Sequence, residues 1–374
     1  MIYCTGIHMP KCGWKGTIKM AKNWWKLLII AVLIALMLLF VPSPVSNYDA
    51  FAETIELEHD IRVGGVKPQW DAYTGIPKKW VSYTGEAHYE DPSISVDLVM
   101  GERFLDTYYC YAVIKISNGS QIRTAFSDDN FKDHKVYGYK IAEAKNAVFA
   151  INGDFCKNKE NPRGFMGYII REGKEYRDIP KAEKAWAQVD SRTGVRYLDW
   201  DMLIIDQNGD FHAILEPRET SVNEWIAEHP DLEIINTFNF GPTVIIDGET
   251  TRETFNSIKV NPNTDWIGTY KETQRIAVCQ LDELTYLCVT CEGPEDKNSK
   301  GMTMDEFVQL LREIESKLDG YSIRVAYNLD GGSSSTFIFK DPSRNGLTKI
   351  NALTRANSQR QLYDIIYFAS AWQK

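Results

Sequence analysis

The chain is poor in histidine and lacks the short signatures of several common catalytic sites. It holds 6 histidines among 374 residues, and none of them forms an HxH or HExxH pair, which argues against a histidine-built zinc site. There is no GK[ST] phosphate-binding loop and no GxSxG nucleophile turn. Carboxylates and loop carbonyls could still bind calcium, but no EF-hand spacing occurs. We therefore predict no metal site and no required cofactor.

Positive charge is also scarce outside the N-terminus. The formal net charge is −9, and residues 1–26 hold five lysines and no acidic residue, so the rest of the chain carries −14. A body this acidic argues against binding to a nucleic-acid backbone, which needs clustered Lys and Arg. The 44% hydrophobic and 25% charged residues are typical of a globular protein rather than a disordered one.

Cysteine is sparse for an exported protein. Cys4 and Cys12 precede the apolar run described next, and the odd set that remains is not a disulfide framework, although one bridge could form. Cys288 and Cys291 form a CxxC inside an apolar strand-like run, with no second CxxC, which indicates buried small side chains rather than a zinc or redox site. The remaining set is Cys110, Cys156, Cys279, Cys288 and Cys291.

Residues 27–41 (LLIIAVLIALMLLFV) form an unbroken apolar run behind the basic residues 1–26. This run is short for a full membrane span of about 20 residues and suits the hydrophobic region of a secretory signal. The lysines keep the N-terminus inside, so we expect the rest of the chain to be exported. The pattern at residues 50–52 leaves both cleavage and retention as a membrane anchor open, and Met20 is an alternative start. The expected location is therefore extracellular or at the cell surface.

The exported part divides into a weakly patterned segment and one domain. Residues 42–93 read as a stalk and an irregular lead-in, and residues 94–374 as the domain. An Asn-Gly turn at residues 208–209 predicts a hairpin, and the capping box from Thr303 to Glu306 predicts a helix start. Many strands and few helices, without βαβ alternation, predict an α+β fold with a mixed or antiparallel sheet. The predicted strands span residues 107–117, 147–151, 165–171, 323–329, 336–339 and 363–369, with two apolar runs within 203–215 on either side of the Asn-Gly turn. Residues 244–246 lead to a turn at Asp247 and Gly248, and the runs IAVCQL and LTYLCV predict a second hairpin across Asp282 and Glu283.

Two polar segments stand at the ends of apolar strands. Residues 152–154 (Asn-Gly-Asp) can aim an amide and a carboxylate out of a sheet edge, because Asn and Gly tolerate turn geometry; a plain turn is the alternative. Residues 328–336 (NLDGGSSST) follow a buried strand. Their glycines and hydroxyls leave backbone N–H groups and side chains available to hold an anionic oxygen, unless they form a simple Gly/Ser loop.

Arg275 opens a strand that is otherwise apolar (IAVCQL). Such an arginine either lies at the sheet edge with its stem on apolar surface or clamps a phosphate or carboxylate. An exported enzyme without ATP, haem or zinc motifs is usually a hydrolase. With few histidines, its proton transfers fall to carboxylates, and two carboxylates in different environments can divide the acid and base roles that glycoside cleavage requires.

Together and in this order, these segments resemble the phosphodiester glycosidase family over roughly residues 105–370. The strand that runs into Asn-Gly-x-Phe and the Asn-Leu-Asp-Gly-Gly turn after a helix and strand carry most of the likeness. The matching segments are NGDF at 152–155, GPTVIIDG at 241–248, QRIA at 274–277, GMT at 301–303 and NLDGGSS at 328–334.

The resemblance implies an α+β domain that cleaves a sugar from a phosphodiester-linked or related α-glycoside in a surface or extracellular glycan. It implies Asp330 as the first candidate for the essential carboxylate, with Asp154 and Glu292 next. Cys156 stands where the family commonly has an aromatic residue, and Glu292 where it usually has Asp. These departures leave open a catalytically inactive module for glycan binding or envelope-polysaccharide assembly. The implied substrate-binding residues are Asn152, Gly153, Arg275, Asn328, Gly331, Gly332, Ser333 and Ser334.

Overall fold

The computed structural model describes most of the chain from residue 65 onward. The apolar run at 27–41, the candidate cleavage pattern, most of the predicted stalk and Cys156 lie outside the described residues. Within those residues, no helix is long and apolar enough to cross a membrane. They belong to one compact unit, Glu53–Lys374. The described residues are 65–75, 84–127, 134–154, 167–180, 182, 201–256, 268–294, 298–343, 346–351 and 360–372.

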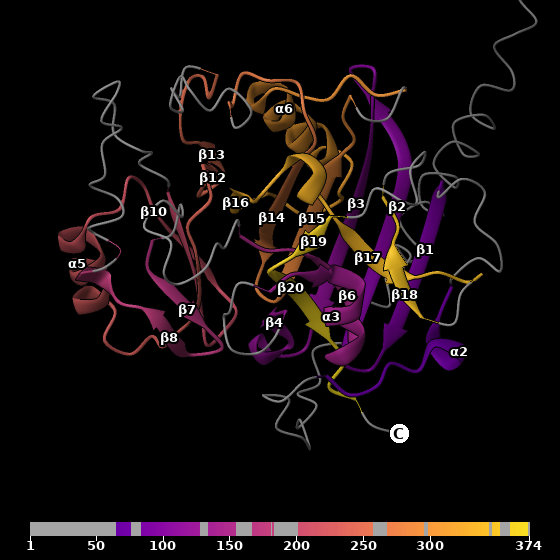
Figure 1. Cartoon of the computed structure of the whole chain (residues 1–374), viewed down its shortest axis with the longest axis horizontal. Helices are drawn as coiled ribbons and strands as arrows, with labels where there is room; N and C mark the ends of the chain where they lie inside the picture. The colour runs from indigo at the N-terminus through magenta and orange to yellow at the C-terminus, as the bar shows by residue number, and fades with distance from the viewer. Residues whose placement is uncertain are drawn as a thin grey trace, which may run out of the picture. The chain divides into compact units, whose positions relative to one another are not determined.

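The largest element is an eight-stranded sheet (Figure 1) whose recorded strand pairs are all antiparallel. The predicted hairpin across Asp282 and Glu283 is confirmed, as is the turn at Asp247 and Gly248. The sheet order is β1 (Gly85–Asp91), β2 (Ile94–Phe104), β3 (Thr107–Ile116), β15 (Thr285–Cys291), β14 (Arg275–Asp282), β16 (Val325–Asn328), β12 (Thr243–Ile246) and β13 (Glu249–Thr250).

A second sheet of five antiparallel strands packs against the first. Val278 on β14 and Phe149 on β6 belong to the same fully buried cluster, so the main core lies between the two sheets. Alternation along each strand sends neighbouring residues to the opposite face. The order of this sheet is β18 (Leu347–Lys349), β17 (Phe337–Lys340), β6 (Ala147–Asn152), β20 (Asp364–Ala369) and β4 (Ile122–Phe126).

One helix covers the outer face of each sheet. α6 (Met304–Glu315) packs Phe307, with other apolar side chains, onto the eight-stranded sheet. α3 (Gly138–Ala144) packs Ile141 onto the five-stranded sheet. The domain core is therefore layered helix, sheet, sheet, helix, and the prediction of an α+β fold is confirmed, with antiparallel rather than mixed sheets.

α6 begins where its capping box predicts. The Glu306 N–H donates to the Thr303 hydroxyl at 3.3 Å, and the Thr303 N–H donates to the Glu306 carboxylate at 2.8 Å. Such a cap contributes about 1 kcal/mol by pairing N–H groups that the helix leaves open. Gly320, with φ +79°, lies just beyond the helix end.

A third sheet has three strands and its own small core. The Asn-Gly turn joins β9 (Met202–Asp206) to β10 (Phe211–Ile214), which confirms that predicted hairpin. β11 (Ile234–Phe238) pairs with the other edge of β9, and α5 (Glu219–Glu228) packs Val222 onto this sheet. The remaining short elements are α2 (Trp70–Tyr73), η3 (Gly119–Gln121), β5 (Val136–Tyr137), β7 (Ile169–Arg171), β8 (Lys174–Arg177), η4 (Gly332–Ser334) and β19 (Gln361–Leu362).

The first sheet starts earlier than the sequence predicts. β1 lies within the stretch read as an irregular lead-in, and Trp70 packs edge-on against Tyr89 of this strand with ring centroids 4.8 Å apart. β1 has the sequence GEAHYED; it is an edge strand, and its exposed face carries charged side chains. A strand that buries so few side chains leaves only a weak apolar pattern.

The CxxC does not form a thiol pair. Cys288 lies in the core between the two sheets and Cys291 under α6, on the opposite face of β15. All four described cysteines are free and buried, which confirms their interpretation as small apolar side chains.

Candidate active site

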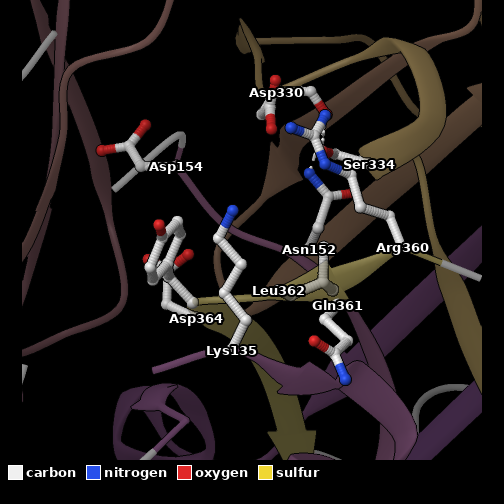
Figure 2. A pocket seen from close by; sticks show the side chains of 10 residues that line it. Lys135, Asn152, Asp154, Asp330, Ser334, Arg360, Gln361, Leu362 and Asp364 are labelled. Carbon is white, nitrogen blue, oxygen red and sulfur yellow. Dashed lines mark hydrogen bonds between the residues drawn. The ribbon is translucent and has the colours of Figure 1, made fainter. Parts of the chain in front are cut away.

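A pocket forms where the ends of three strands meet. β6 and β20 are antiparallel neighbours, so the C-terminal end of β6 lies beside the first residues of β20. The loop after β16 closes the pocket from the other sheet. We call it the carboxylate pocket (Figure 2). Its volume is about 280 Å³, which includes space open to solvent. Its described lining is Lys135, Asn152, Asp154, Asp330, Ser334, Arg360, Gln361, Leu362, Tyr363 and Asp364.

Asn152 joins two of these strand ends. Its Nδ2 donates to the Asp330 backbone carbonyl at 2.8 Å, and its Oδ1 accepts from the Thr336 N–H at 3.0 Å. The side chain is 1% exposed. Both ends of the amide thus bind the loop that carries Asp330, so Asn152 positions that carboxylate.

Gly153 is required by close packing. A Cβ at this position would lie 2.6 Å from the carboxyl carbon of Asp364, which is closer than non-bonded carbons can approach. The Gly153 N–H also donates to the Asp364 carbonyl at 3.3 Å. The absence of a side chain therefore allows Asp364 to reach the pocket beside Asp154.

Asp154 is held by three donors. Its Oδ2 accepts from the Asn239 N–H at 2.9 Å, its Oδ1 accepts from the Phe240 N–H at 3.1 Å, and Arg171 Nη2 lies 3.4 Å from Oδ2. Burial raises the pKa of Asp154 to about 7, although Arg171 and the two amides favour the charged form; the nearby Asp364 carboxylate raises the pKa further. Near neutral pH this group can therefore carry or release a proton.

Arg171 is a site residue that the sequence did not reveal. It ends β7, is 3% exposed, and donates from Nη2 to Asp364 Oδ2 at 3.0 Å while also facing Asp154. Its guanidinium carbon lies 4.3 Å above the Phe238 ring. The only signal was an arginine at the end of an apolar strand, and Asp364 gave no signal of its own.

Asp330 follows β16 and lines the pocket, together with the cationic side chains of Lys135 and Arg360. Burial raises its pKa to about 6, while a hydrogen bond with the Ser334 side chain and the charges of Arg360 and Lys135 act in the opposite direction. Arg360 Nη1 donates to the Ser334 hydroxyl at 3.2 Å. Figure 2 shows the Lys135 amino group pointing into the space between Asp154 and Asp330.

The glycine turn after Asp330 is shaped by packing on Gln274. A Cβ on Gly331 would lie 2.6 Å from the Gln274 carbonyl oxygen, and the Gly332 N–H donates to that oxygen at 2.9 Å. The Ser334 N–H donates to the Gly331 carbonyl at 3.2 Å. The expectation that this turn offers its N–H groups to an anion is thus wrong for Gly332 and Ser334. The half-buried Ser333 lies between them and does not line the described pocket.

The prediction that Arg275 holds the substrate phosphate is not supported by its contacts. Its Nε donates to the Met302 carbonyl at 3.1 Å, and its Nη2 donates to the carbonyls of Gly268, Thr269 and Lys271 at 3.0, 3.2 and 2.7 Å. The side chain is 6% exposed and does not line the carboxylate pocket. Because backbone carbonyls take its donors, Arg275 fixes a neighbouring loop instead of binding an anion.

Asn328 and Glu292 also lie outside the described lining of the pocket. Asn328 Nδ2 donates to the Gly241 carbonyl at 2.8 Å, so its amide holds the turn before β12. Glu292 is 3% exposed, and its N–H donates to the Tyr108 carbonyl at 2.8 Å beyond the end of β15. Of the three predicted carboxylates, the structure brings together Asp154 and Asp330 and leaves Glu292 apart.

The pocket is a set of carboxylates with adjacent cations. Within the described ranges, no three His, Cys, Asp or Glu side chains are arranged to hold a metal ion. Asp154 and Asp330 differ in environment, since the first is fixed by amides and an arginine and the second by a hydroxyl. Such a pair can divide proton-transfer roles, while Arg360 and Lys135 can neutralise an anionic group beside them.

The chain is similar to a known protein family. The profile of the phosphodiester glycosidase family matches residues 145–369, more than half of the chain, which confirms the resemblance seen in the sequence. No curated protein matches the chain.

The chain is also similar to solved structures. The zebrafish N-acetylglucosamine-1-phosphodiester alpha-N-acetylglucosaminidase catalytic domain, auto-inhibited by its pro-peptide, has a TM-score of 0.50 and 13% identity, covering 75% of this chain and 85% of that one. A hypothetical protein from Synechocystis has a TM-score of 0.45 and 11% identity, covering 76% and 63%. At this identity, the zebrafish structure supports the fold alone.

Proposed function

Because this chain belongs to the phosphodiester glycosidase family, we propose that it is an exported glycoside hydrolase that releases a sugar from a phosphodiester-linked glycoside. The observation that carries this proposal is the carboxylate pocket. Two carboxyl groups with raised pKa values, Asp154 and Asp330, line it together with the cations Arg360 and Lys135. This is the arrangement that hydrolysis of a bond between a sugar and a phosphate needs.

The leaving group is a phosphate monoester, which carries negative charge and is weakly basic. Its departure therefore depends more on charge neutralisation than on full protonation. Arg360 is positioned by its hydrogen bond to Ser334, and Lys135 points into the same space (Figure 2). In the proposal these two side chains bind the phosphate, which is the role that the sequence assigned to Arg275.

Water must be deprotonated as it attacks the anomeric carbon. Asp330 has a pKa of about 6, so it is mainly ionised at pH 7 and can accept that proton. Asp154, with a pKa of about 7, can hold a proton near neutral pH and share it with the substrate. Arg171 and the two backbone amides fix the orientation of Asp154. The two groups thus supply a base and a proton reservoir.

Export and membrane proximity belong to the proposal as well. They rest on the basic segment 1–26 and the apolar run 27–41 in the sequence. An exported hydrolase of this kind would meet its glycan or sugar-phosphate substrate on the surface or outside the cell. No nucleic acid is expected as a ligand, because of the acidic body.

The test is release of free sugar from a panel of sugar 1-phosphodiesters by residues 53–374, the compact unit of the structure. We expect turnover by the wild type and its loss in Asp330→Asn. Asp319→Asn, at an exposed position after α6, is the matched control and should keep wild-type turnover. If the folded wild type releases no sugar from the panel, and wild type and Asp330→Asn bind the same glycans with equal affinity, the protein is a binding module and not a hydrolase.

A further inference from the structure

A second, larger cavity lies beside edge strand β4 and the β7–β8 hairpin. It encloses about 580 Å³, including space open to solvent. We call it the basic cavity, because its described lining has four cationic side chains and one carboxylate. The lining is Arg123, Thr124, Ala125, Phe126, Lys145, Arg171, Glu172, Lys174, Tyr176 and Tyr367.

Arg123 and Glu172 in the lining of this cavity form an ion pair. Arg123 is 3% exposed, and its Nη2 lies 2.8 Å from Glu172 Oε2. The Thr124 N–H donates to Glu172 Oε1 at 2.6 Å. The charges of Arg123 and Lys145 both stabilise the ionised form of Glu172, and this one carboxylate among four cations in the described lining leaves the cavity with a positive excess.

Lys145 and Lys174 supply that excess from separate elements. Lys145 follows the last turn of α3 and is half-buried, whereas Lys174 opens β8 and is exposed. Lys174 Nζ lies 4.9 Å from the centroid of the Tyr176 ring, and Tyr176 packs edge-on against Phe126 at 4.9 Å. A cationic rim beside an aromatic wall suits a ligand that has both an anionic group and a sugar ring.

Arg171 connects the two sites. Its Nη2 faces Asp154 and Asp364 in the carboxylate pocket, while the same side chain lines the basic cavity. Arg171 therefore borders the basic cavity and contacts two carboxylates that line the carboxylate pocket. The charge of Arg171 is offset by those two carboxylates, and the lysines of the described lining are Lys145 and Lys174.

We propose that the basic cavity is a second binding site that takes the neighbouring anionic sugar unit of a polymer whose scissile linkage lies in the carboxylate pocket. This inference rests on the proposed function and narrows it to a substrate with repeated anionic units. The chain has a net charge of −9, which repels an anionic polymer. A cation-rich cavity near the carboxylates would provide the local positive charge that binds such a polymer.

The experiment measures binding without turnover. The full chain with Asp330→Asn is titrated calorimetrically with a one-unit sugar 1-phosphodiester and with a four-unit sugar-phosphate oligomer. The test variant adds Lys145→Gln and Lys174→Gln. The matched control adds Lys340→Gln instead, a half-buried lysine on β17 that lines neither site. Thermal melts establish that each variant is folded.

We expect the oligomer to bind more tightly than the single unit, because occupying two linked sites raises the effective concentration. The double lysine variant should lose about tenfold in oligomer affinity, the combined effect of two charge contacts, and less than about twofold for the single unit. Raising the salt concentration should reduce the difference. The Lys340→Gln control should match the parent.

Two results would overturn the proposal. One is equal binding of the oligomer and the single unit, and the other is an oligomer affinity that the two lysine substitutions leave within about twofold. The two proposals fail separately: absent sugar release with lysine-dependent oligomer binding rejects the hydrolase alone. Sugar release with lysine-independent oligomer binding rejects only the second site.

Discussion

Asp330→Asn should make the protein more stable at neutral pH while abolishing its activity. In the fold, burial raises the pKa of this carboxyl from its usual 3.8 to about 6. The folded state therefore binds a proton more tightly than the unfolded state. The wild type thus loses stability as the pH rises from about 4 to about 6, and this loss remains at higher pH.

The magnitude follows from the shift in pKa. One pKa unit corresponds to about 1.36 kcal/mol, so the ionised Asp330 costs at most about 3 kcal/mol of unfolding free energy at pH 8. An asparagine has nearly the same shape and carries no charge, so it removes that cost. Because the side chain is partly exposed and screened by solvent, we expect a gain of about 1–3 kcal/mol at pH 8.

The assay is urea unfolding of wild type and Asp330→Asn at pH 4 and at pH 8. The difference in unfolding free energy between the two proteins should be larger at pH 8 than at pH 4. Asp319→Asn serves as the control and should show no such change between the two pH values. A wild type that is more stable than Asp330→Asn by the same amount at both pH values would refute the reasoning, since the buried charge would then carry no cost.

Three further predictions follow from the site. Gly153→Ala should reduce turnover at least tenfold and lower the unfolding free energy by about 1–3 kcal/mol, measured by steady-state kinetics and urea unfolding, because its Cβ would collide with Asp364; unaltered kinetics would contradict the packing argument. Arg275→Lys should destabilise the fold by about 2–4 kcal/mol with little change in KM, since one ammonium cannot replace donors to four carbonyls; a large rise in KM with intact stability would restore it as a substrate ligand. The value of kcat/KM should fall below about pH 6, as Asp330 gains a proton, and above about pH 7, as Asp154 loses one. If Asp330→Glu keeps residual activity and the decrease on the acid side stays at the same pH, that decrease belongs to another group.

Local patterns predicted much of the fold. The capping box at Thr303, the Asn-Gly hairpin and the alternating strands depend on residues close in sequence, so they could be read directly. β1 was missed because an edge strand with an exposed face buries few side chains. The packing of two sheets face to face depends on pairings between distant strands, which a single sequence does not encode in any short pattern.

The site shows the same limit. Asp154 and Asp330 could be predicted from polar residues at the ends of apolar strands, and the structure places both in the pocket. Arg171 and Arg275 give the same signal, an arginine at one end of an apolar strand. Arg171 contacts two carboxylates as well as the backbone carbonyls of Ile170 and Thr237, whereas the printed hydrogen bonds of the Arg275 side chain all go to backbone carbonyls. Only the fold decides which groups face a guanidinium, so the sequence alone does not distinguish an arginine beside the pocket from one that holds a loop.

The most direct test is a crystal structure of Asp330→Asn with a bound sugar 1-phosphodiester. The account predicts the phosphate within hydrogen-bond distance of Arg360 and Lys135, and the anomeric carbon facing the position of the Asp330 carboxyl group. A phosphate bound at Arg275, or a sugar outside the carboxylate pocket, would contradict it.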